Sequence, residues 1–79
     1  MGETILTIQE KIRILLIRRG NISEAELARR LGVLPQNFSR KMKTGKFTNA
    51  DLERIAAVLD CTVAYTETVF KMNDTGEEI

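Results

Sequence analysis

One short segment concentrates side chains that could contact nucleic-acid bases. Between Pro35 and Lys43 the chain carries two amides, a hydroxyl and three cations. A guanidinium can donate to O6 and N7 of guanine together, and an Asn or Gln amide can bond adenine in the same bidentate way. We therefore expect three residues to contact bases: Gln36, Asn37 and Arg40.

The spacing around this segment predicts two short helices joined by a tight turn. Ser23 opens an S-x-x-E capping box, which marks a helix start. Gly32 follows where a left-handed residue would end that helix. Pro35 suits the first position of the next helix, expected over about Pro35–Lys43 and anchored by Phe38. This is a helix-turn-helix, whose second helix would present the base-contacting groups.

Two further helices and a shared core are expected. Thr7 and Thr48 each begin a pattern typical of a helix N-terminus, and Gly20 would end the first helix. Apolar residues at helical spacing predict one aliphatic core. Its expected centre is Leu27, Leu31, Phe38, Leu52, Ile55 and Leu59, joined by Ile12 and Leu15.

After Asp60 the composition changes to β-formers. We expect Thr62 to Met72 to form one strand that pairs with the same strand of a second chain, because an unpaired edge favours association. The alternative is a hairpin within the chain, through a turn at Asn73 to Gly76. We divide the chain into residues 1–61, the helix-turn-helix part, and 62–79, a C-terminal extension of the same domain. The expected dimer interface is Val63, Tyr65, Val69 and Phe70.

Composition excludes several classes of protein. The 79 residues are 43% hydrophobic, which suits one folded domain. There is no His and only one Cys, so we expect no zinc site, no disulfide and no enzyme; no metal or cofactor is indicated. Cys61 is expected to be a small buried residue. No apolar run is long enough to span a membrane, and we expect a cytoplasmic protein without membrane contact.

The net charge of +1 conceals a segregation of charge. Four basic residues and no acid lie between Leu34 and Phe47, whereas three acids and no base lie between Asn73 and Ile79. A positive recognition helix and a negative tail are therefore expected. No separate sensor segment is visible, so we expect no small-molecule effector.

The order of these elements resembles the lambda-repressor-like (Cro/Xre) helix-turn-helix family of prokaryotic DNA-binding domains. The resemblance is carried by SEAELA at 23–28, LGV at 31–33, QNFSR at 36–40 and the Leu52-x-x-Ile55-Ala56-x-x-Leu59 stripe. It implies a mainly α fold, a bundle of four to five helices with a C-terminal β-strand or hairpin. It also implies that Gln36 and Arg40 contact bases, and that Thr44, Gly45 and Lys46 form a loop on the phosphate backbone.

Two positions depart from the family pattern. Glu24 stands where the family often has Gln touching a phosphate, and Leu34 stands where Ser or Thr usually caps the recognition helix.

The expected phosphate contacts are Ser39, Lys41, Lys43, Thr44 and Lys46. The resulting hypothesis is a homodimeric, sequence-specific transcriptional regulator that binds double-stranded DNA. The alternative is a protein-interaction module on the same fold, such as an antitoxin or antirepressor-like factor.

Overall fold

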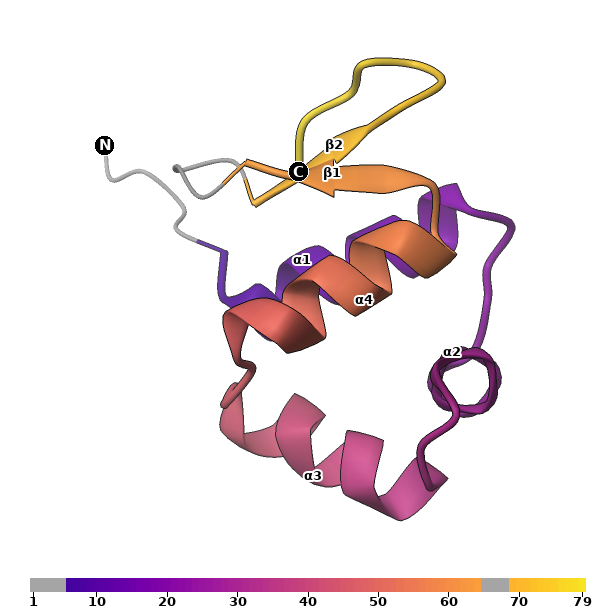
Figure 1. Ribbon diagram of the computed structural model, residues 1–79, viewed down its shortest axis with the longest axis vertical. Helices are drawn as coiled ribbons and strands as arrows, with labels where there is room; N and C mark the ends of the chain where they lie inside the picture. The colour runs from indigo at the N-terminus through magenta and orange to yellow at the C-terminus, as the bar shows by residue number, and fades with distance from the viewer. Residues whose placement is uncertain (1–5, 65–68) are drawn as a thin grey trace.

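The computed structural model describes residues 6–64 and 69–79 (Figure 1). In that part of the chain four helices precede a small antiparallel sheet: α1 (Ile8–Arg18), α2 (Glu24–Leu31), α3 (Pro35–Thr44), α4 (Asn49–Val58), β1 (Cys61–Val63) and β2 (Phe70–Met72). The helix α3 lies at one end of the molecule and the sheet at the other, with α1 and α4 between them. The expected mainly helical bundle with a C-terminal hairpin is confirmed. No helix within the described residues has the length and apolar character needed to cross a membrane.

The helix starts follow the capping pattern of the sequence. Thr7 and Thr48 begin α1 and α4 with complete capping boxes, in which each side chain bonds a free backbone N–H of the first turn. Ser23 caps α2 by accepting the N–H of Glu26 at 3.0 Å. The carboxylate of Glu26 does not complete that box, because it binds two arginines of α2 instead.

The turn between α2 and α3 is short and fixed by the backbone. Gly32 ends α2 with φ +73°, a left-handed conformation that favours glycine. The N–H of Val33 then bonds the carbonyl of Ala28 at 3.0 Å, which closes a Schellman motif. Pro35 stands at the start of α3, and Leu34 before it makes no side-chain cap. The expected left-handed Gly32 and the expected helix start at Pro35 are both confirmed.

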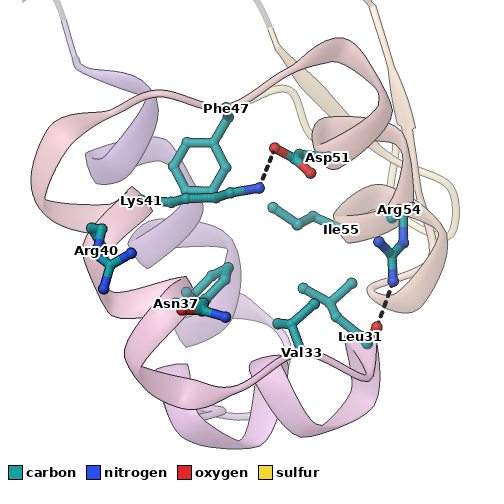
Figure 2. Close-up of a pocket in the computed structure, with 10 residues that line it drawn as sticks. Leu31, Val33, Asn37, Arg40, Lys41, Phe47, Asp51, Arg54 and Ile55 are labelled. Carbon is teal, nitrogen blue, oxygen red and sulfur yellow. Dashed lines mark hydrogen bonds and ion pairs between the residues drawn. The ribbon is translucent and has the colours of Figure 1, made fainter.

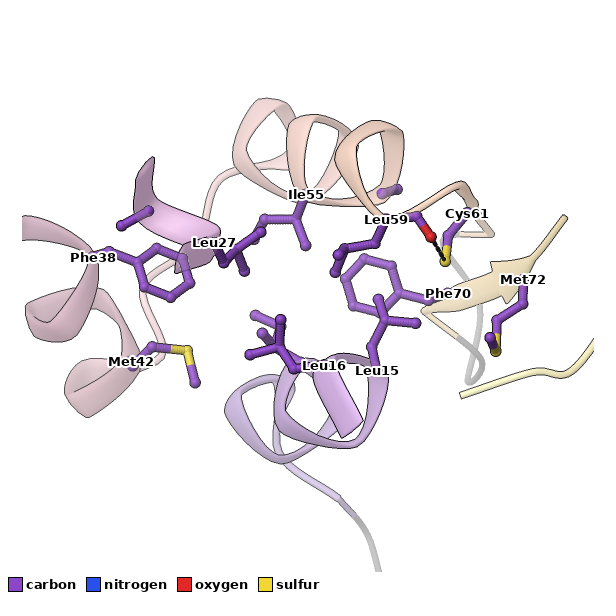
Figure 3. Packing of buried hydrophobic residues seen from close by; sticks show 13 residues of the cluster. Leu15, Leu16, Leu27, Phe38, Met42, Ile55, Leu59, Cys61, Phe70 and Met72 are labelled. Atoms are coloured by element: carbon purple, nitrogen blue, oxygen red, sulfur yellow. Dashed lines mark hydrogen bonds between the residues drawn. The ribbon is translucent and has the colours of Figure 1, made fainter. Parts of the chain in front are cut away.

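A single core runs from α3 to the sheet (Figure 3). Phe38 and Met42 fill its α3 end, and Phe70 fills the end beneath the sheet. The buried residues are Ile12, Leu15, Leu16, Leu27, Ala28, Phe38, Met42, Ile55, Ala56, Leu59, Cys61, Phe70 and Met72. Six of the eight predicted core residues are among them. Leu31 and Leu52 are only half-buried and pack at its edge.

Cys61 lies in the core as expected. Its side chain is buried beside the sheet, and its thiol donates to the carbonyl of Leu59 at 3.3 Å. Burial raises the pKa of this thiol above its ordinary value. The cysteine therefore acts as a small packing residue.

The prediction of one strand from Thr62 to Met72 is wrong. The chain reverses direction between β1 and β2, which pair antiparallel with Val63 opposite Phe70. The tail then returns along the other side of β2, where Lys71 bridges Glu78. This return uses the turn expected at Asn73 to Gly76, in which Gly76 has a φ of +75°. This pairing within the chain corresponds to the hairpin alternative, and it leaves β2 with a neighbour on both sides.

Arg19 holds this hairpin against the helices. Its guanidinium donates to the carbonyls of Leu59 and Asp60 at 2.8 and 2.9 Å, and it binds the Asp74 carboxylate through two nitrogens. The contact lowers the pKa of Asp74 and raises the pKa of Arg19. The acidic tail is thus fastened to the end of α1, where a second pair joins Arg18 to Glu77.

Candidate nucleic-acid interface

From Gln36 to Thr44, the exposed face of α3 carries polar and cationic side chains only. At about 100° per residue, Gln36, Arg40 and Lys43 fall on the side of the helix opposite Phe38 and Met42. The first three are exposed and the last two are buried, as this spacing requires. The burial of Phe38 therefore fixes which residues of α3 meet solvent.

Two further predicted contacts lie on the flanks of this face. Asn37 is exposed on the side towards α4, and Ser39 is half-buried on the other side.

The hydroxyl of Thr44 makes hydrogen bonds within the chain. It donates to the Arg40 carbonyl at 3.2 Å. It also accepts the N–H of Lys46 at 3.4 Å. Thr44 therefore shapes the loop that follows α3.

This loop presents Lys46 from a fixed backbone. Gly45 ends α3 with φ +73°, and a Cβ there would lie 2.8–3.0 Å from the side chain of Gln9. The left-handed φ favours glycine at this position, whereas the Gln9 amide is the end of a flexible side chain that can move aside. Phe47 then returns to the core and packs edge-to-face on Phe38, with ring centroids 6.1 Å apart. The exposed Lys46 is held between these two anchors.

Lys41 differs from the other cations of α3. Its ammonium lies 2.8 Å from a carboxylate oxygen of Asp51, so the residue joins α3 to α4. Lys41 was expected to contact phosphate. In the structure its side chain points towards α4, because position 41 lies beside the buried face of the helix.

Ten of the twelve cations fall into two groups by ion pairing, whereas Arg54 donates to the carbonyl of Leu31. Six of them pair with carboxylates: Arg13, Arg18, Arg19, Arg29, Arg30 and Lys41. Among the described residues, Arg40, Lys43, Lys46 and Lys71 have no such partner and no hydrogen bond from the side chain. Three of these four lie on α3 or directly after it. The uncompensated positive charge is therefore concentrated at one end of the molecule.

Both acids of α2 pair with arginines. Glu24 pairs with Arg13 at 3.6 Å. Glu26 binds Arg29 and Arg30, and these contacts lower the pKa of its carboxyl to about 2. The negative charge of Glu24, which would oppose the approach of a phosphate, is thus partly balanced within the chain.

A pocket of about 400 Å³ opens between the end of α2, α3 and α4 (Figure 2). Two cross-links border it: the Lys41–Asp51 pair and a hydrogen bond from Arg54 to the carbonyl of Leu31. The lining residues are Leu31, Val33, Asn37, Phe38, Arg40, Lys41, Phe47, Asp51, Arg54 and Ile55. The first cross-link joins α3 to α4, and the second joins the end of α2 to α4. Sequence patterns gave no signal for Arg54, whose partner is a backbone carbonyl.

A comparison with protein families decides the class of this helix pair. Residues 3–46 match the model of the CENP-B N-terminal DNA-binding domain, a span that covers more than half of the chain. The chain belongs to this family. The CENP-B match runs from the segment before α1 to Lys46, so it includes the whole helix-turn-helix and its loop. No curated protein and no solved structure matches the chain.

Membership of the CENP-B N-terminal family confirms a DNA-binding helix-turn-helix. It does not support the narrower assignment to the Cro/Xre family. The partner shown for the chain is DNA. Within residues 6–64 and 69–79, no group of three His, Cys, Asp or Glu side chains could hold a metal ion.

The expected dimer residues are not gathered on one exposed surface. Phe70 has no solvent exposure and belongs to the core of its own chain, because β2 folds back on β1. Val63 and Val69 are half-buried against that core. Tyr65 lies outside the described residues.

Proposed function

We propose that this chain is a sequence-specific transcriptional regulator whose helix α3 enters the major groove of double-stranded DNA. The observation that carries the proposal is the set of three unpaired cations, Arg40, Lys43 and Lys46, around an exposed row of amides. Unpaired cations release counterions from DNA on binding, and amides can distinguish bases. Paired cations elsewhere on the chain offer less of this driving force.

The exposed residues of α3 divide by chemistry into two roles. Arg40 contacts O6 and N7 of a guanine, and Gln36 and Asn37 contact adenine edges. Lys43 and Lys46 bind phosphates on either side of the groove, together with Ser39 and the loop at Thr44. Lys41 acts through its ion pair with Asp51, which holds α3 in position.

Selection of bound sites from random duplex DNA, followed by sequencing, tests the proposal directly. Arg40→Ala should relax the base preference at one position and cost about 1–3 kcal/mol of binding free energy. Lys46→Ala should weaken binding to all sequences alike and reduce the salt slope by about one unit. Lys71→Ala is the matched control, because Lys71 is an exposed unpaired lysine on β2.

Three results would contradict the proposal. The first is a selected pool without sequence preference, and the second is equal DNA affinity in the wild type, Arg40→Ala and Lys46→Ala. The third is a loss of affinity in Lys71→Ala as large as that in Lys46→Ala, which would move the interface to the sheet.

We also propose that the regulator acts as a homodimer. One recognition helix spans only a few base pairs, and helix-turn-helix proteins gain affinity by occupying two half-sites about 34–36 Å apart. The outer edge of β1 supports this proposal, since it pairs with no described residue while β2 is flanked on both sides. Sedimentation should give twice the mass of the chain at high micromolar concentration. A monomer under those conditions would contradict dimerisation in the absence of DNA.

A further inference from the structure

A large aliphatic side chain is exposed at the N-terminal tip of α3. Leu34 is 58% exposed, and among the described residues only Ile17 on α1 is a comparably exposed large hydrophobic side chain. The two large apolar side chains of α3 itself, Phe38 and Met42, are buried. Leu34 thus contributes little to the core, and it leaves α3 without a side-chain cap.

The backbone holds Leu34 in one position. Its φ and ψ are −68° and 137°, and its carbonyl accepts the N–H groups of Asn37 at 3.0 Å and Phe38 at 3.1 Å. The ring of Pro35 fixes its own φ at a helical value and keeps Leu34, the residue before it, in an extended conformation. The side chain is therefore carried on a rigid turn, two residues before Gln36 and at the end of the helix that enters the groove first.

We propose that Leu34 reads the C5-methyl group of a thymine. This methyl is the apolar group that the four natural bases present in the major groove, and aliphatic side chains recognise it by contact. The inference rests on the proposed insertion of α3 into the groove. It gives a reason for an exposed leucine at a position where Ser or Thr would stabilise the helix better.

Replacement of thymine by uracil removes only this methyl and tests the contact directly. Each thymine of the selected site is changed to uracil in turn, and affinity is measured for the wild type, Leu34→Ala and Ile17→Ala. We expect the wild type to lose about fourfold in affinity at one position, the scale of one buried methyl group. Leu34→Ala should show no further loss at that position. Ile17→Ala should lose as much as the wild type.

The possible outcomes separate this inference from the proposed function. A wild-type protein that binds its selected site specifically but ignores uracil at every position would overturn the inference alone. Full sensitivity to uracil in Leu34→Ala would overturn it in the same way, as would a selected site without thymine. A protein without sequence preference would overturn both the inference and the proposed function. Thermal unfolding of Leu34→Ala near the wild-type midpoint should accompany the supporting result.

Discussion

The ammonium of Lys41 and the carboxylate of Asp51 lie 2.8 Å apart and join the recognition helix to the helix that follows it. Partial burial opposes ionisation of Asp51, but Lys41 and the N–H of Thr48 outweigh it and hold the pKa of the carboxyl below its ordinary value. Asp51 thereby serves two structures at once, the cap of α4 and the link to α3. Lys41 and its neighbour Lys43 consequently have different roles, although both are lysines of α3.

Removing the charge of each lysine should separate stability from DNA binding. Lys41→Met should lower the free energy of unfolding by about 1 kcal/mol, because it leaves Asp51 without its cation. Lys43→Met should change stability by less than about 0.5 kcal/mol. It should instead reduce the salt slope of DNA binding by about one unit, an effect that Lys41→Met should lack. Urea unfolding and a salt titration of DNA affinity measure the two quantities. An identical profile for both variants would contradict this division.

The Glu26 carboxyl should titrate near pH 2 in the folded protein. Its contacts with Arg29 and Arg30 lower the pKa from 4.5 to about 2. Because the folded pKa lies below the unfolded one, these contacts stabilise the fold above pH 4.5. The stabilisation is lost as the pH falls towards 2. A carboxyl NMR titration measures the pKa directly. Joint replacement of both arginines by Gln should restore an ordinary value, whereas Arg54→Gln, which removes a bond to a backbone carbonyl, should not.

Arg19 should be needed for the hairpin and dispensable for the recognition helix. Arg19→Lys should lower the free energy of unfolding by about 1–3 kcal/mol, since one ammonium cannot reach two carbonyls and a carboxylate together. Amide exchange should quicken at Asn73, whose N–H bonds the carbonyl of Asp60. Arg18→Lys is the matched control, because Arg18 forms one exposed pair. A loss of amide-exchange protection that appears first in α3 would contradict this role of Arg19.

Phe70 should behave as a core residue rather than a dimer contact. Phe70→Ala should cost about 3–5 kcal/mol of stability, as should Phe38→Ala at the other end of the core. Such a loss is a large part of the stability of a small domain. Thermal unfolding and sedimentation together provide the measurement. If Phe70→Ala stayed stable and changed only its oligomeric state, Phe70 would be a dimer contact and not a core residue.

Leu34→Ser should improve the fold and impair recognition. The backbone at this position already has the extended conformation of an N-cap, so a hydroxyl can bond a free N–H of the first turn. The free energy of unfolding should rise by about 1 kcal/mol. Affinity for a thymine-containing site should fall, while affinity for the uracil-substituted site should remain. Leu34→Ala is the control that lacks both the cap and the methyl contact. A variant without added stability would show that the cap does not form.

Local signals were sufficient for most of the helical fold. Thr7, Ser23 and Thr48 were identifiable as caps because a short polar side chain before an apolar stripe has few other uses. Gly32 and Pro35 indicated the turn, because Gly favours the left-handed conformation that ends a helix and Pro suits the first helical position. The orientation of α3 then followed from Phe38, its one large apolar anchor. The exposed set of Gln36, Asn37, Arg40, Lys43 and Lys46 was therefore predictable from the sequence.

The C-terminal part was not predictable in the same way. No Gly, Pro, Asn or Asp lies between Cys61 and Met72, so the reversal that pairs β1 with β2 had no turn signal. Contacts between residues distant in the sequence could not be predicted either. The Lys41–Asp51 pair and the Arg19 contacts depend on how the helices pack, and charge spacing along one helix cannot show them.

The segment that follows β2 lies at the end of the molecule opposite the recognition helix. Ile79 exchanges backbone hydrogen bonds with Phe70 at the sheet, and α3 occupies the opposite end of a molecule 38 Å long (Figure 1). A fluorescent group attached to the exposed turn at Asn73 to Gly76 would therefore lie away from bound DNA. The hairpin is thus a suitable place to label the protein without obstructing the recognition helix.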